Sequence, residues 1–105
     1  MTRVEVGILD LAGEFAADKD KAREVRETFI IPALENGHEV VLNFAGVEFA
    51  TQSFVHALIS VALRRFGDAA LGLIVFRDCS EAVQTIVETV VDYTLFAPGT
   101  ADDDA

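Results

Sequence analysis

Two side chains that can act together in nucleophilic catalysis, Ser53 and His56, are three residues apart in the sequence. On a helix this spacing places both on one face, where the imidazole can accept the proton of the hydroxyl group. A nucleophilic serine also needs a third group that orients the histidine and donors that stabilise an oxyanion. The sequence supplies neither, so it predicts no catalytic role for this pair.

The single cysteine, Cys79, follows Asp78 and precedes a predicted helix. A helix N-terminus can lower the pKa of a thiol, which makes reactivity a hypothesis beside the simpler role of a small apolar residue. Cys79, His38 and His56 do not have the spacing of a metal site, and no phosphate-binding glycine motif is present. The sequence therefore predicts no metal, no cofactor and no enzymatic activity.

The composition predicts one domain with a strongly acidic surface. The chain has 105 residues and a formal net charge of −10. This length suits one compact domain, placed over residues 1–97, and the charge argues against nucleic acid and anionic membranes as partners. A lone cysteine, no apolar run of membrane-spanning length and no secretory signal predict a cytoplasmic protein. Residues 98–105 are expected to form an acidic, disordered tail.

Apolar residues alternate between the periods of strands and helices along the chain. Strands are predicted at residues 4–11, as an edge strand, and at residues 39–44 and 71–76, as buried strands. Between them, residues 45–49 are expected to form a loop. Three strands that alternate with three helices predict an α/β fold, with a mostly parallel central sheet that helices cover on at least one face.

Capping residues predict where the three helices begin and end. Their starts are predicted at Asp18 or Asp20, at Thr51 or Ser53, and at Ser80. Pro32 should kink the first helix or end its regular part, and Asn36–Gly37 should stop it. Gly67 should end the second helix, which is expected to pack on the sheet through three apolar side chains, those of Phe54, Leu58 and Val61.

The segment Val40–Leu58, which reads VVLNFAGVEFATQSFVHAL, resembles the STAS domain and most closely the uncharacterised STAS-like proteins. The resemblance is carried by the strand and loop Leu42–Val47 and by the helix start Gln52–Phe54. The surrounding helices and strands fit the same order. The resemblance implies a STAS-like fold and a regulatory role similar to that of an anti-sigma factor antagonist, which binds another protein and is not an enzyme.

In anti-sigma factor antagonists, a partner kinase phosphorylates a serine at this helix start, and Ser53 matches that serine. The resemblance thus implies phosphorylation of Ser53 and an anti-sigma-type ATPase or serine kinase as partner. A plain helix cap is the alternative role of this residue. The chain departs from the family pattern at Asn43, Thr51, Gln52 and Phe54. The predicted partner-binding residues are Asn43, Gly46, Glu48, Thr51, Gln52, Ser53, Phe54 and His56.

Two alternatives of other classes stay open. The first is a homo-oligomeric structural or assembly protein, with Phe96 and the strand edge at Val4 as contacts of a homodimer. The second is a small-molecule-binding domain that uses the C-terminal ends of strands, near Asn43, Ser53 and Asp78, where ligands of parallel sheets gather.

Overall fold

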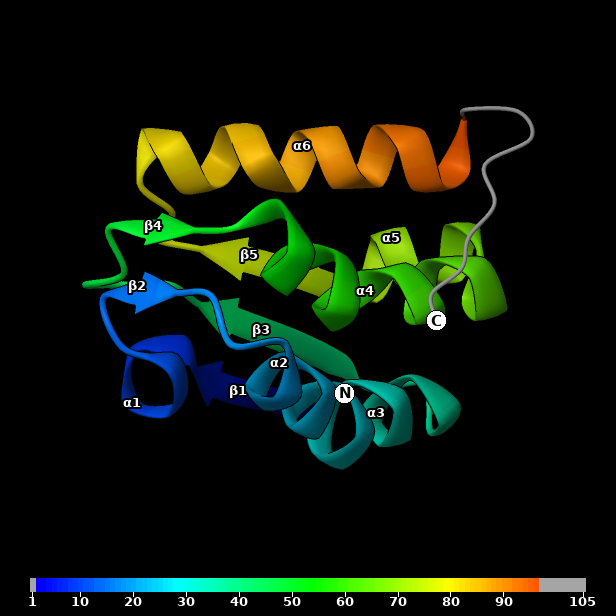
Figure 1. Ribbon diagram of the computed structural model, residues 1–105. Coiled ribbons are helices and arrows are strands. Elements are labelled where there is room, and N and C mark those ends of the chain that lie inside the picture. The colour runs from blue at the N-terminus through cyan, green and yellow to red at the C-terminus, as the bar shows by residue number, and fades with distance from the viewer. Residues whose placement is uncertain (1, 97–105) are drawn as a thin grey trace.

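Three parallel strands form the main sheet of the computed structural model, which describes residues 2–96 (Figure 1). They are β1 (Arg3–Gly7), β3 (Glu39–Asn43) and β5 (Ile74–Arg77), in the order β1-β3-β5. A second, two-stranded parallel pair consists of β2 (Phe15–Ala16) and β4 (Phe49–Ala50). The predicted parallel sheet is confirmed, with its first strand at an edge, whereas the loop predicted at residues 45–49 contains the start of β4.

The three predicted helices connect these strands in the predicted order, and two short helices that were not predicted, α1 (Ile8–Ala12) and α5 (Asp68–Leu73), accompany them. The first predicted helix consists of α2 (Lys19–Val25), a π-helical turn (Arg26–Ile30) and α3 (Ile31–Glu35), and the other two are α4 (Gln52–Phe66) and α6 (Glu81–Leu95). The π-helical turn joins α2 to α3 without a gap. Pro32 has no N–H group to donate a hydrogen bond to the carbonyl group four residues earlier, and the π-helical turn, which is wider than an α-helical turn, directly precedes α3. The predicted interruption at Pro32 is therefore a local widening of the helix.

The predicted caps are found at three helix starts. Asp18 caps α2 by accepting from the N–H group of Asp20, and Ser80 caps α6 by accepting from that of Val83. Thr51 caps α4. Gly67 ends α4 with a positive φ of 59°, as glycine tolerates.

Two of the predicted strands are too long. The strand predicted at residues 4–11 ends at Gly7, because its partner β3 ends at Asn43, opposite Gly7. Past that point no strand remains to accept the hydrogen bonds of residues 8–12, and these form α1 instead. The strand predicted at residues 71–76 begins at Ile74, since residues 71–73 are the last turn of α5. The acidic tail predicted at residues 98–105 lies outside the described residues.

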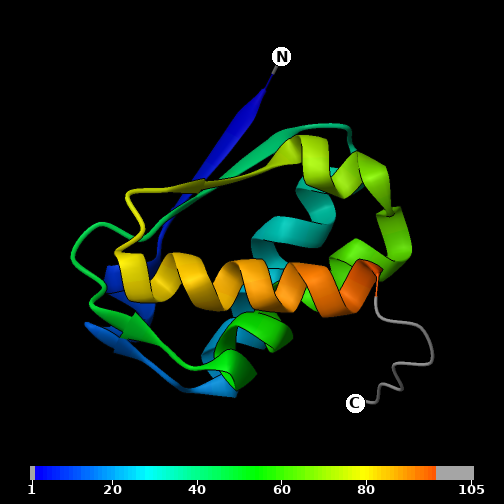
Figure 2. The ribbon, with the colours of Figure 1, turned by 90° about the horizontal axis from the view of Figure 1, so that it is seen from above.

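The helices pack on one face of the sheet, as Figure 2 shows from above. Val6, Leu42 and Ile74 point to this face and belong to the hydrophobic core. The core also takes Phe54 and Leu58 of α4, as predicted, while Val61 is only partly buried. On the other face, Val41 is fully buried between its strand neighbours. Burial of β3 on both faces is therefore confirmed, although helices cover only one of them.

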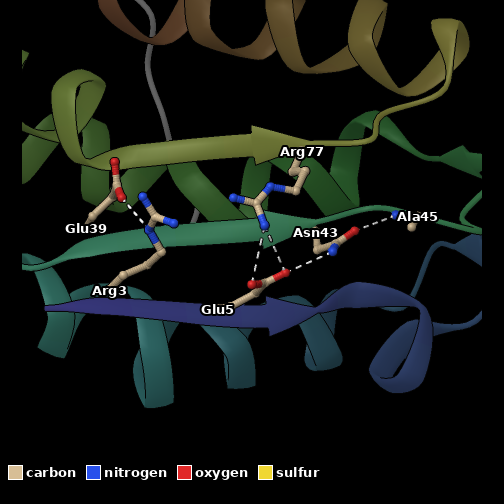
Figure 3. A network of polar contacts seen from close by, with 6 residues as sticks. All are labelled: Arg3, Glu5, Glu39, Asn43, Ala45 and Arg77. Carbon is tan, nitrogen blue, oxygen red and sulfur yellow. Dashed lines mark hydrogen bonds and ion pairs between the residues drawn. The ribbon is translucent and has the colours of Figure 1, made fainter.

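Polar side chains cover the outer face of the sheet (Figure 3). Glu5 of β1 accepts a hydrogen bond of 2.9 Å from the amide of Asn43 on β3, and its carboxylate lies 3.4 Å from Arg77 on β5. Arg3 and Glu39 form an ion pair of 2.7 Å across the same strands. The contacts of Glu5 link all three strands and orient the Asn43 side chain, whereas Arg3 and Glu39 join β1 and β3 at their N-terminal ends.

Candidate functional site

The start of α4 presents Ser53 to solvent. Thr51, and not Ser53, is the N-cap, because its hydroxyl oxygen accepts from the N–H group of Phe54 at 3.1 Å. Ser53 is the second residue of the helix, and its side chain is exposed. The alternative role of Ser53 as a plain helix cap is therefore wrong. Its hydroxyl group lies in the first turn of α4 and does not cap the helix.

Alanine substitutions at these two positions should separate the cap from the exposed serine. Thr51→Ala is expected to lower the free energy of unfolding by about 1 kcal/mol, since the cap hydrogen bond is lost. Ser53→Ala should change it by less than about 0.5 kcal/mol, as is usual for exposed positions. Urea unfolding of both variants beside the wild type measures this difference. An equal or larger loss for Ser53→Ala would show that Ser53 has a structural role after all.

Phe54 cannot contact a partner protein in this fold. Its side chain is 0% exposed and packs in the core beneath α4. The prediction that Phe54 belongs to a partner-binding surface is therefore corrected. A helix places successive residues about 100° apart, so Ser53 and Phe54 cannot both face solvent. The core takes the larger apolar side chain.

The other predicted partner-binding residues lie on different surfaces. Gly46 and Glu48 are exposed in the loop before β4, and Gln52 is exposed beside Ser53. Asn43 instead lies on the outer face of the sheet, where its side-chain oxygen accepts from the N–H group of Ala45 at 2.9 Å. Gly46, Glu48, Gln52 and Ser53 are thus exposed along the stretch from the loop to the start of α4, whereas the side chain of Asn43 is held on the outer face of the sheet.

An exposed apolar end adjoins this group and was not predicted from the sequence. We call the residues Leu9, Leu11, Phe15 and Phe49 the apolar end. Phe15 is 63% exposed and stacks on Phe49, with 5.3 Å between ring centroids. Leu9 and Leu11 of α1 are exposed as well. Both aromatic rings come from the short β2–β4 pair, and β4 leads directly into the cap of α4. The sequence feature that could have indicated this surface is Phe15, a large apolar residue outside the apolar stripes of the predicted strands and helices.

A cavity of about 540 Å³ opens between α2, α4 and α6. Lys19, Arg23 and Arg26 line it from α2 and the π-helical turn. The wall from α4 includes Gln52, Ser53, His56 and Ser60, and α6 contributes Tyr93. The imidazole Nδ1 of His56 is hydrogen-bonded to the Tyr93 hydroxyl at 2.9 Å, and the two rings stack. Ser53 and His56 therefore line the same cavity, although the side chain of Ser53 is also exposed to solvent.

The strand ends do not assemble one ligand site. A second cavity, of about 440 Å³, lies beyond β5 and is lined by Asp78, Cys79 and residues of α6. Ser53 and Asp78 thus belong to different cavities, and Asn43 lines neither of them. The alternative of a small-molecule site built from Asn43, Ser53 and Asp78 together is corrected. Among residues 2–96, no three His, Cys, Asp or Glu side chains are close enough to hold a metal ion.

Cys79 is expected to react slowly with alkylating agents. Burial raises the pKa of its thiol above the ordinary value of 9.0, and the carboxylate of Asp78 raises it further. Less thiolate is present at neutral pH than in a free peptide. Iodoacetamide should therefore modify the folded protein more slowly than the same chain in urea at equal pH. A folded protein that reacts faster would restore the hypothesis of an activated thiol.

The same raised pKa gives the sign of a dependence of stability on pH. The unfolded chain releases the thiol proton at lower pH than the folded chain does. The contribution of Cys79 to folding is thus complete below pH 9.0 and is lost as the pH rises above it. In a Cys79→Ser variant, the free energy of unfolding should therefore decrease less than in the wild type as the pH rises above 9.0.

The fold and the site define a small α/β domain with a parallel sheet, helices on one face and an exposed serine at the start of a central helix. A family model described as STAS-like domain of unknown function (DUF4325) matches residues 21–84, and the chain belongs to this family. The match runs from α2 to the first turn of α6 and includes the start of α4. Comparisons with curated proteins and with solved structures gave no match. Within residues 2–96, no helix combines the length and apolarity needed to cross a bilayer.

Proposed function

We propose that the protein is a non-enzymatic regulatory module that binds another protein through the apolar end and the adjoining start of α4. The observation that carries this proposal is the stacked pair of the exposed Phe15 and the half-buried Phe49, which precedes the exposed Ser53 by four residues in the chain. Exposed apolar groups of this kind mark protein interaction sites in soluble domains. Rigid aromatic rings are also the side chains that most often dominate the binding energy of interfaces.

Ser53 is suited to act as a switch at the border of this surface. Phosphorylation would add about 1.5 to 2 negative charges at neutral pH. The first turn of α4 tolerates such a group, because N–H groups at a helix N-terminus point toward it and the helix dipole favours it. Modification would leave the fold intact and would change the charge beside the apolar end. A partner that contacts both features would then be released.

The proposed partner is an anti-sigma-type ATPase or serine kinase, as for the antagonists that the family resembles. The net charge of −10 favours a partner with a basic surface and disfavours nucleic acid and anionic lipid. Charge complementarity of this kind accelerates association and selects among partners. We place the protein in the cytoplasm, where such kinases act.

Titration calorimetry with a purified anti-sigma-type ATPase of the same cell tests the proposal. Wild type and Ser53→Ala should bind, whereas Ser53→Asp and Phe15→Ser should weaken binding at least about tenfold, as expected at a hot spot. Phe96→Ser is the matched control, since Phe96 is 69% exposed at the end of α6, away from the apolar end. Equal binding by all variants would contradict the proposed surface.

Light scattering on the same samples separates this proposal from the homodimer alternative. A dimer through Phe96 and the edge of β1 would lose mass on Phe96→Ser and keep it on Phe15→Ser. A regulatory module that binds through the apolar end predicts the same mass for both variants at all concentrations. Loss of mass confined to Phe96→Ser would favour the homodimer.

A further inference from the structure

The cavity between α2, α4 and α6 differs in charge from the rest of the molecule. The whole chain has 18 acidic residues against eight Lys and Arg. Three of those eight cations, Lys19, Arg23 and Arg26, line this one cavity, and among residues 2–96 no Asp or Glu lines it. Cations gathered in a concave site of an acidic protein indicate that the site receives an anion.

The three cations form one wall because of their spacing. Lys19, Arg23 and Arg26 are four and three residues apart, so they lie on the same face of a helix. Neighbouring like charges on one helix face destabilise it. Two exposed carboxylates relieve part of this repulsion, since Asp20 pairs with Arg23 at 2.8 Å and Glu27 pairs with Arg26 at 2.7 Å. Neither carboxylate lines the cavity.

The cationic wall formed by Lys19, Arg23 and Arg26 retains N–H groups that can donate hydrogen bonds to a ligand. Arg23 meets Asp20 through Nη1, which leaves its Nε and Nη2 groups. Arg26 uses Nε for Glu27 and Nη1 for the carbonyl oxygen of Ala57, so that Nη2 remains, and its side chain is only 17% exposed. Lys19 forms no ion pair with any residue that the structure describes.

The opposite wall combines polar side chains of α4 and α6 with two apolar residues of α4, Ala57 and Val61. It includes the hydroxyl group of Ser53 and the amide of Gln52, while the Tyr93 hydroxyl is hydrogen-bonded to His56 and Ser60 is the most buried lining residue, at 2% exposure. Hydroxyl and amide groups can donate hydrogen bonds to phosphate oxygens. The volume of about 540 Å³ falls in the range of small-molecule sites.

We propose that this cavity binds a small molecule that carries a phosphate or diphosphate group. Two guanidinium groups and one ammonium group suit a ligand with several negative charges on closely spaced oxygens, which arginine binds in a forked geometry. A single carboxylate has only two oxygens, fewer than the remaining N–H donors of Lys19, Arg23 and Arg26 can engage. The inference stands apart from the proposed function, because it concerns the unmodified protein without a partner.

Titration of the full chain with pyrophosphate tests the proposal. Calorimetry should show saturable binding, and the NMR amide signals of Ser53 and Ser60 should move with the same dissociation constant. The variant Lys19→Gln with Arg23→Gln removes two cations of the wall, both on exposed side chains. We expect its affinity to fall at least about tenfold, since charge-assisted hydrogen bonds are lost.

The control variant is Lys21→Gln with Arg65→Gln, which changes the net charge equally but touches neither cavity. Its affinity should stay within about twofold of wild type, because exposed charges at a distance are screened by salt. Two results would overturn the proposal. One is the absence of saturable binding to the wild type. The other is an equal loss in both double variants, which would indicate attraction by overall charge without a site.

Discussion

Replacement of Phe54 with alanine should lower the free energy of unfolding by about 3–5 kcal/mol, because it leaves a large void in the core. The side chain is 0% exposed and is among the largest fully buried side chains of the described residues. It packs under α4, which contacts α2, α6 and α5 and is therefore the central helix of the domain. Since small domains have only about 5–15 kcal/mol of stability, this variant should be close to unfolding.

Urea unfolding monitored by circular dichroism measures the loss. Gln52→Ala is the matched control in the same helical turn, because Gln52 is exposed and alanine favours helices. It should change the free energy of unfolding by less than about 0.5 kcal/mol. A Phe54→Ala variant as stable as this control would mean that the first turn of α4 is not packed as described.

The Phe54 result also bears on the interpretation of binding experiments. Phe54 adjoins Ser53 in the sequence, so a Phe54→Ala variant that fails to bind a partner would invite a functional explanation. The burial of Phe54 shows that such a loss would reflect unfolding. Phe15→Ser is the informative change, since Phe15 lies at the surface.

Replacement of Gly46 with alanine should cost about 1–3 kcal/mol of stability, the usual range for a strained backbone conformation. Gly46 has a φ of 84°, a region that residues with a Cβ atom rarely adopt. It is the third residue of a turn in which the N–H group of Val47 donates to the carbonyl of Phe44 at 2.9 Å. A Cβ atom here would also lie 2.7 Å from Cδ2 of Leu9, so that side chain would have to move.

Gly72→Ala is the control for the Gly46 prediction. Gly72 lies within α5, has no positive φ, and a Cβ atom there would meet no other atom within 4 Å. Alanine should therefore stabilise the protein by about 0.5–1 kcal/mol, because glycine is a poor helix former. Thermal unfolding of both variants should shift in opposite directions. Destabilisation by Gly72→Ala, or none by Gly46→Ala, would contradict this account.

Gly46 also connects stability to the proposed surface. Its turn holds the loop that leads to Phe49, and its close neighbour Leu9 belongs to the apolar end. A substitution that displaces Leu9 should therefore alter partner binding even where the domain stays folded. This effect can be measured at a temperature well below the unfolding transition of the variant.

The sequence determined the features that depend on local chemistry. The order of the main strands and helices followed from apolar periodicity. Ser80 was predicted as a capping residue, and the starts at Asp18 or Asp20 and at Thr51 or Ser53 were predicted because each of these side chains can accept from N–H groups of the first turn. Gly67 was recognised as a helix end for an equally local reason. The STAS-like family was recognised from the short stretch around Ser53, and the family match confirms it.

Tertiary structure decided the extent of the strands and the composition of the sites. β1 stops at Gly7 because its neighbour has no further residue to pair with, which no property of residues 8–11 reveals. The sequence placed Phe54 both on the sheet, with Leu58 and Val61, and among the partner-binding residues beside Ser53, and only packing against the core decides between these two predictions. The cationic wall of Lys19, Arg23 and Arg26 faces Ser53 because α2 packs on α4, a contact between segments about thirty residues apart. Such contacts are set by how whole faces of helices fit together, so a linear pattern cannot specify them.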